Sequence, residues 1–149
     1  MFISLSLSLK MAVLHLSPFR WKGLGPILLH SVISYQKPGL PVLWIAHNAR
    51  LFDVPFIIEG FSRCSMGVPS GWLFLETLPF ACEVVKSEGS KVQFVSLASL
   101  CIHYDIQPAG TAHGAMSDVH TLSLVLQRMT YDLLLSISIL LQRSFIAPA

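Results

Sequence analysis

The chain has 149 residues, a length that suits one domain around a single core. Charged residues make up only 12% of it, about half the usual share, whereas 53% of the residues are apolar. The formal net charge of +2 is too small to indicate nucleic-acid binding by charge alone, so any basic surface for a nucleic acid must be local.

Residues 1–19 form a divergent apolar and serine-rich segment. Lys10 interrupts the segment, no basic region precedes it and no clear cleavage site follows, so a secretory signal fits poorly. A transit peptide fits better, because such segments are rich in serine and lack acids, although this one carries little arginine. Alternatively, residues 3–9 (ISLSLSL) alternate apolar and polar side chains with the period of two that is typical of a strand.

From residue 24 the chain alternates between helical and strand patterns. The pattern predicts helices at 24–35, 52–63 and 78–86 and strands at 41–46 and 72–77. Pro26 falls in the first turn of the first helix, where proline is tolerated, and Asp53 lies near the start of the second. Both strands are short continuous apolar runs, which favours a parallel sheet covered on both faces. The alternation predicts an α/β layer fold.

Two more helices are predicted, at 96–104 with Ser96 as its cap and at 116–142. Apolar residues in the last helix follow spacings of three and four: Val119, Leu122, Leu126, Met129 and Leu133. Asp118 lies in its first turn, where the helix dipole stabilises a carboxylate. The apolar run at 133–141 is about half the roughly 20 residues that a bilayer requires, so we expect no stable membrane span.

His113 and Asp118 are the first candidate pair for chemistry. If both were helical, they would lie about 140° apart around the axis, so His113 must precede the helix on a loop rich in glycine and alanine. A histidine base beside a metal-binding carboxylate is an arrangement that activates water. Taken alone, the spacing is more often that of a loop histidine and a carboxylate that stabilises a helix start. Asp53 likewise fits a helix cap, and His47 fits a packed residue at the end of a strand.

The motifs, taken in order, resemble those of the DnaQ-like 3′-5′ exonucleases of the DEDDh type, in particular plant exonuclease-domain proteins. WIAHNARLFDVPFI is similar to the second motif of that family, and AHGAMSDVHTLSLVLQRMT is similar to the third, a His-x-x-x-x-Asp signature. WLFLETLPFACEVV and SLASLCIHYDI are similar to the elements between them. The resemblance covers about residues 20–133.

The resemblance implies an RNase H-like three-layer fold, with a mixed sheet flanked by helices. It also implies that Asp53 and Asp118 help to hold two divalent ions, Mg²⁺ or Mn²⁺, and that His113 is the general base. The substrate would be the 3′ end of DNA or RNA, contacted by His47, Asn48 and Arg50. The sequence leaves open whether the chain forms a homodimer.

The first motif of the family, an Asp-x-Glu pair on the first strand, does not occur in this sequence. We therefore expect a fold that is truncated or altered at its N-terminal strands, with a partial exonuclease domain at 20–142 and a tail at 143–149. Two carboxylates instead of four predict weak metal binding and impaired turnover. The alternative is a non-catalytic remnant that binds nucleic acid or a protein partner. Smaller departures are Gly114, in place of a basic residue, and Glu76, where the family usually has Asp.

The three cysteines, Cys64, Cys82 and Cys101, are far apart and show no Cys-x-x-Cys spacing, which argues against a zinc site and a disulfide framework. An intracellular protein is expected, with an organelle and the nucleus both open. Association with a membrane is the least favoured interpretation.

Overall fold

A computed structural model describes residues 2–4, 18–87, 89, 95–107 and 115–148. Its central sheet has four strands in the order β1-β2-β3-β4. The strands are β1 (Phe2–Ser4), β2 (Val42–Ala46), β3 (Trp72–Glu76) and β4 (Phe145–Ile146). β1, β2 and β3 run parallel, and β4 pairs antiparallel with β3, so the sheet is mixed. The predicted α/β class with a mixed sheet is confirmed.

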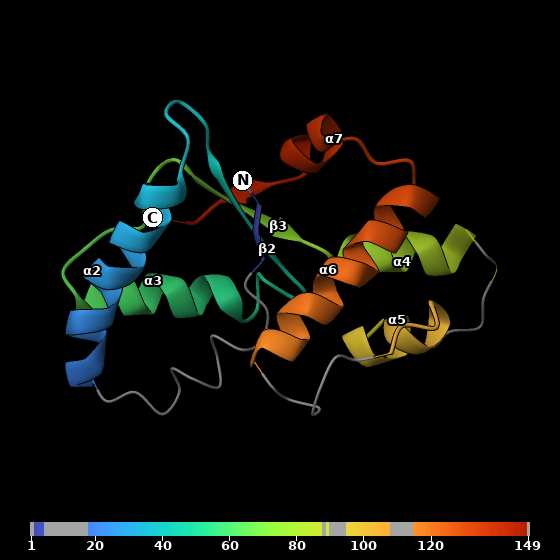
Figure 1. Cartoon of the computed structure of the whole chain (residues 1–149), viewed down its shortest axis with the longest axis horizontal. Helices are drawn as coiled ribbons and strands as arrows, with labels where there is room; N and C mark the ends of the chain where they lie inside the picture. Colours follow the sequence, from blue (N-terminus) through green and yellow to red (C-terminus); the bar gives the residue numbers. More distant parts are fainter. Residues whose placement is uncertain (1, 5–17, 88, 90–94, 108–114, 149) are drawn as a thin grey trace.

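Six helices are described: α2 (Pro18–Tyr35), α3 (Asp53–Arg63), α4 (Leu78–Ser87), α5 (Leu97–His103), α6 (Ala115–Asp132) and α7 (Ile137–Gln142). Figure 1 shows α2 and α3 on one side of the sheet, and α4, α5 and α6 on the other. Within the described part of the chain, no helix is long and apolar enough to cross a membrane.

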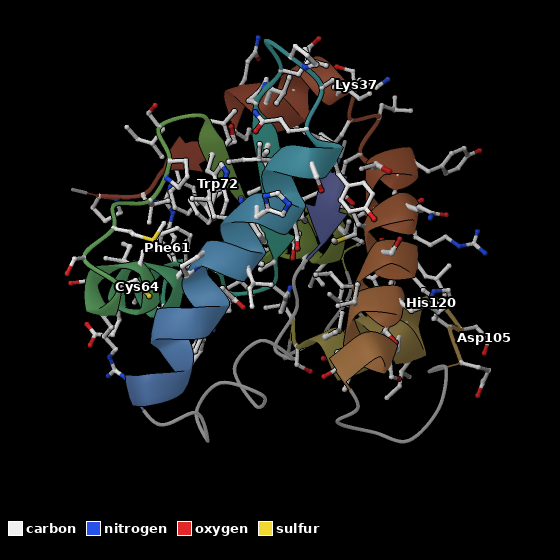
Figure 2. The ribbon with its side chains drawn as sticks, turned by 60° about the vertical axis from the view of Figure 1, so that its left-hand side comes forward. Lys37, Phe61, Cys64, Trp72, Asp105 and His120 are labelled. Atoms are coloured by element: carbon white, nitrogen blue, oxygen red, sulfur yellow. The ribbon has the colours of Figure 1, made fainter. Side chains whose placement is uncertain are left out.

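Alternate residues of β2 enter two separate cores, because successive side chains of a strand point to opposite faces. Val42, Trp44 and Ala46 pack with Ile57 and Phe61 of α3. Trp44 and Phe61 both contact the ring of Trp72, and Figure 2 shows Phe61 and Trp72 in this core beside Cys64. A Cβ atom at Gly25 would lie 2.8 Å from the Cys64 sulfur, so glycine allows α2 to approach α3 closely.

The second core lies under α4, α5, α6 and α7. Its strand residues are Leu43 and Ile45 of β2 and Leu75 of β3. Helical residues complete it: Phe80, Ala81, Val84, Leu100, Cys101, Val125, Met129 and Leu140. Helices therefore cover both faces of the sheet, as expected for buried parallel strands.

The predicted N-terminal strand overlaps β1 only at Ile3 and Ser4, and residues 5–9 lie outside the described part of the chain. At the other end, Phe145 and Ile146 form β4, whereas the sequence predicts a C-terminal tail there. Two residues carry no readable period, which explains why the sequence pattern did not reveal this strand.

The predicted first helix begins too late. α2 starts at Pro18 rather than residue 24, so Pro26 lies in its interior instead of its first turn. Proline there removes one intrahelical hydrogen bond, and its ring clashes with the preceding turn. The predicted span from residue 24 therefore contains Pro26 and the later turns of α2 but leaves out residues 18–23.

The predicted last helix is wrong as a single element, because α6 ends at Asp132 and α7 begins at Ile137. Leu134 has a φ of 52°, and its N–H donates to the Tyr131 carbonyl while the Leu135 N–H donates to the Thr130 carbonyl. This pair of bonds is a Schellman motif, which terminates a helix at a left-handed residue. Glycine usually occupies that residue, so a leucine there gave no stop signal in the sequence.

We predict that Leu134→Gly raises the free energy of unfolding by about 0.5–1 kcal/mol, because glycine adopts positive φ without steric cost. Leu134 is 84% exposed, so little packing is lost. Urea denaturation measures the effect. Leu51→Gly is the control, since Leu51 is also exposed but is absent from the positive-φ residues, and it should not stabilise. Equal changes in both variants would contradict the argument.

Candidate functional site

The candidate site lies where β2 and β3 end. The two strands pair in register from Val42 opposite Trp72 to Ala46 opposite Glu76, and the Thr77 N–H donates to the Ala46 carbonyl. The segments that follow β2 and β3 therefore leave the sheet at the same edge. Ligands of parallel α/β sheets bind beyond the carboxyl ends of the strands. The loop at 47–52 leads from this edge into α3, and Thr77 leads into α4.

Asp53 is the first residue of α3, and its side chain is only 6% exposed. The preceding residue, Phe52, occupies the cap position and makes no side-chain cap hydrogen bond. Asp53 is thus inside the first turn, as predicted, rather than in the capping position. The positive end of the helix dipole offsets part of the cost of burying its carboxylate.

His47 is buried, with both ring nitrogens bonded inside the protein. Nε2 lies 2.8 Å from the Val95 carbonyl, which can only accept, so Nε2 carries the proton. Nδ1 then accepts from the Thr77 hydroxyl, at 2.9 Å. Burial lowers the pKa of His47, against the raising effects of the Val95 hydrogen bond and the Glu76 carboxylate. The expectation of a packed, hydrogen-bonded histidine is confirmed.

Asn48 and Arg50 follow on the same loop. Asn48 has a φ of 65°, a left-handed conformation that asparagine tolerates better than most residues. The Arg50 guanidinium carbon lies 3.7 Å from the centre of the Phe145 ring, so a cation–π contact orients an exposed cation beside this edge. Phe145 belongs to β4, the strand that the sequence pattern missed.

Glu76 is the residue of this edge whose role sequence reasoning missed. Its carboxylate, on a side chain 9% exposed, accepts hydrogen bonds from the backbone N–H groups of Asn48, Arg50 and Leu78. The available signal was a carboxylate at the end of a strand otherwise made of apolar residues, because a buried charge requires partners.

Asp118 lies in the first turn of α6, as predicted, and is half-buried. His113 falls at 108–114, outside the described residues, so its predicted role as a base stays a prediction. In the described part of the chain, no group of three or more histidine, cysteine, aspartate or glutamate side chains could hold a metal ion. Asp53 and Asp118 offer the right donor chemistry for Mg²⁺ or Mn²⁺, but the described residues do not complete such a site.

Comparison with known proteins decides the family. A family model described as exonuclease, of the RNase T type, matches residues 41–126, which span Asp53, His113 and Asp118. The chain belongs to the RNase T/DnaQ-like exonuclease family. The resemblance inferred from the motifs is thereby confirmed, and nucleases of this family are metal-dependent.

Three relatives agree with this family. The chain is 46% identical to "Exonuclease DPD1, chloroplastic/mitochondrial" of Arabidopsis thaliana, over 83% of the chain and 40% of that relative. It is 29% identical to "Three prime repair exonuclease 2" of Mus musculus, over 83% of the chain and 53% of that relative. With the Homo sapiens protein of the same name it shares 31% identity, over 63% and 42% respectively. The chain thus spans about half or less of the length of these relatives.

We predict that the free energy of unfolding falls as the pH drops below about 6.5, the ordinary pKa of histidine. His47 has a lowered pKa when folded, so the unfolded chain binds a proton that the native chain does not. Its contribution is complete above that pH and declines as the pH falls toward the folded pKa. Urea denaturation between pH 5 and 8 measures it, on the protein and on His47→Gln.

His47→Gln should show a shallower pH dependence, because the titrating group is gone. His120→Gln is the matched control, since His120 is exposed on α6 and projects away from the sheet (Figure 2). It should keep the slope of the unmodified protein. Identical slopes in all three proteins would contradict the account of His47.

Proposed function

We propose that this chain acts on the 3′ end of DNA or RNA as a 3′-5′ exonuclease-family protein that hydrolyses terminal phosphodiesters. The observation that carries the proposal is the family match over 41–126, which contains Asp53, His113 and Asp118 in family order. Asp53 and Asp118 each lie in the first turn of a helix, α3 and α6, so each carboxylate is near a positive helix end. Attack from the 3′ end is supported by the names of two relatives, which are three prime repair exonucleases.

The proposed activity depends on two divalent ions, Mg²⁺ or Mn²⁺, which by general principle orient and activate water and neutralise the leaving oxygen. We propose that turnover is impaired in this chain. The Asp-x-Glu pair of the resembled family is absent from the sequence, and the described residues do not complete a metal site. Two close dications with half of their carboxylates would repel each other with little compensation.

The test is degradation of a 5′-labelled single-stranded oligonucleotide by the purified chain in Mg²⁺ and in Mn²⁺. A weak 3′-to-5′ ladder is expected, and Asp118→Asn should reduce it at least about ten-fold, because it removes a metal-binding charge. Asp132→Asn is the matched control, since Asp132 is exposed at the other end of α6. Equal rates in the two variants would contradict the role of Asp118.

The second candidate function is a non-catalytic remnant that binds nucleic acid or a protein partner. The incomplete donor set among the described residues favours it. A folded chain that binds an oligonucleotide but yields no ladder in either metal would establish it over the enzyme.

The exonuclease and the nucleic-acid-binding form of the remnant both predict nucleic-acid contacts from the loop that carries His47, Asn48 and Arg50. We predict that Arg50→Ala weakens binding of a labelled single-stranded oligonucleotide and lowers the salt slope by about 1, because one phosphate contact is lost. Fluorescence anisotropy between 50 and 200 mM salt measures both quantities. Arg63→Ala is the control, because Arg63 lies at the far end of α3 in an exposed ion pair with Glu59. Identical slopes for the two variants would contradict the prediction.

We place this function inside the cell, in an organelle. The name of the Arabidopsis relative, chloroplastic/mitochondrial, and the three free cysteines support this localisation. Fractionation of cells that produce the native protein tests it. The homodimer stays a prediction, for which light scattering is the measurement.

A further inference from the structure

The Glu76 carboxylate accepts hydrogen bonds from three backbone N–H groups, two on the loop after β2 and one at the start of α4. Oε1 accepts from the Asn48 N–H at 2.6 Å and from the Leu78 N–H at 3.0 Å, and Oε2 accepts from the Arg50 N–H at 3.2 Å. Asn48 and Arg50 belong to the loop after β2, whereas Leu78 is the first residue of α4. One buried side chain therefore connects the ends of both central strands.

The charge of the Glu76 carboxylate strengthens these three hydrogen bonds. A carboxylate that accepts from N–H groups forms charge-assisted hydrogen bonds, which are shorter and stronger than neutral ones. Leu78 lies at the N-terminus of α4, where the helix dipole favours a negative charge. The left-handed backbone of Asn48 accompanies the shortest of the three bonds.

A second hydrogen bond, between the neighbours of Glu76 and Asn48, connects the same two segments. Thr77 is fully buried, and its hydroxyl donates to Nδ1 of His47, which precedes Asn48. The bond from His47 to the Val95 carbonyl adds the segment ahead of α5. Consecutive residues at the end of β3 thus hold consecutive residues after β2, so the loop has two independent attachments.

We propose that Glu76 is a positioning residue, which fixes the backbone of the 47–52 loop and thereby the direction of the Asn48 and Arg50 side chains ahead of Asp53. What the loop presents these side chains to rests on the proposed function. The fixation of the loop does not, because it follows from the hydrogen bonds alone. Glu76 itself touches no substrate in this proposal.

The direct test is hydrogen exchange of individual backbone amides, followed by NMR on the full chain. In Glu76→Ala the amides of Asn48, Arg50 and Leu78 should each exchange about ten- to a hundred-fold faster, because each loses a charged acceptor. The Trp44 and Phe74 amides, within β2 and β3, should keep their rates. Unchanged protection at Asn48 and Arg50 would overturn the proposal.

Glu76→Gln gives a sharper result and keeps the test decisive if Glu76→Ala does not fold. The amide oxygen of glutamine replaces Oε1 and retains two bonds, whereas its NH₂ group faces the Arg50 N–H and cannot accept. Only the Arg50 amide should therefore lose protection, a pattern that general destabilisation does not produce. Loss at all amides alike, or at none, would overturn the proposal. The control is Glu83→Gln on α4, where Glu83 makes an exposed ion pair with Arg143.

A double-mutant cycle connects the loop to binding of a labelled single-stranded oligonucleotide. Glu76→Gln should weaken binding several-fold in the unmodified chain and have no further effect in the Arg50→Ala background, because it acts through Arg50. Equal effects in both backgrounds would overturn that link. If the unmodified chain binds no oligonucleotide, the proposed function fails, whereas the exchange rates still decide whether Glu76 fixes the loop.

Discussion

The parallel, in-register pairing of β2 with β3 is the constraint on which the rest of the structure depends. Because Ala46 lies opposite Glu76, both strands end at the same level, and the residues that follow them meet at one edge. The same pairing presents two apolar faces, one to α2 and α3 and the other to α4, α5, α6 and α7. A shift of one residue would exchange these faces and also separate Glu76 from the loop.

The sequence predicted the elements whose signals are local. β2, β3, α3, α4 and α5 agree with their predicted spans to within a residue or two, because each is a bounded apolar run or carries a cap such as Ser96, which accepts from the Ser99 N–H. The errors occurred where the local signal points the wrong way. Pro26 concealed the first turns of α2, and Leu134 occupies a position that usually requires glycine.

In the candidate site, too, the sequence predicted the features that depend on local signals and missed those that depend on distant contacts. The positions of Asp53 and Asp118 at helix starts, and the burial of His47, followed from pattern and are confirmed. The contact of Glu76 with the 47–52 loop could not be predicted, because its two partners on that loop lie 26 and 28 residues away and meet it only after the strands pair. The family itself came from the order of the motifs, since spacing alone also fitted a loop histidine and a helix-start carboxylate.

Scarce charge makes the use of each acid informative. Glu59 and Glu83 form exposed ion pairs with Arg63 and Arg143, a type of contact that contributes about 0–1 kcal/mol. Asp53 and Glu76 are instead buried, which is costly unless donors or dipoles compensate. Glu76 has three backbone donors in addition to a helix N-terminus. Glu76 is therefore engaged by the fold itself.

The strand on the other side of β2 limits the negative charge at this edge of the sheet. β1 runs parallel to β2, with Phe2 opposite Leu43 and Ser4 opposite Ile45, and its sequence Phe-Ile-Ser contains no acid. This position in the sheet therefore contributes no negative charge to the edge. The buried carboxylates described near this edge belong to other elements, Asp53 to α3 and Glu76 to β3, and Glu76 already accepts three backbone hydrogen bonds. Asp53 and Glu76 each lie beside a helix N-terminus, that of α3 and that of α4, so the helix dipoles compensate part of the negative charge that this edge carries.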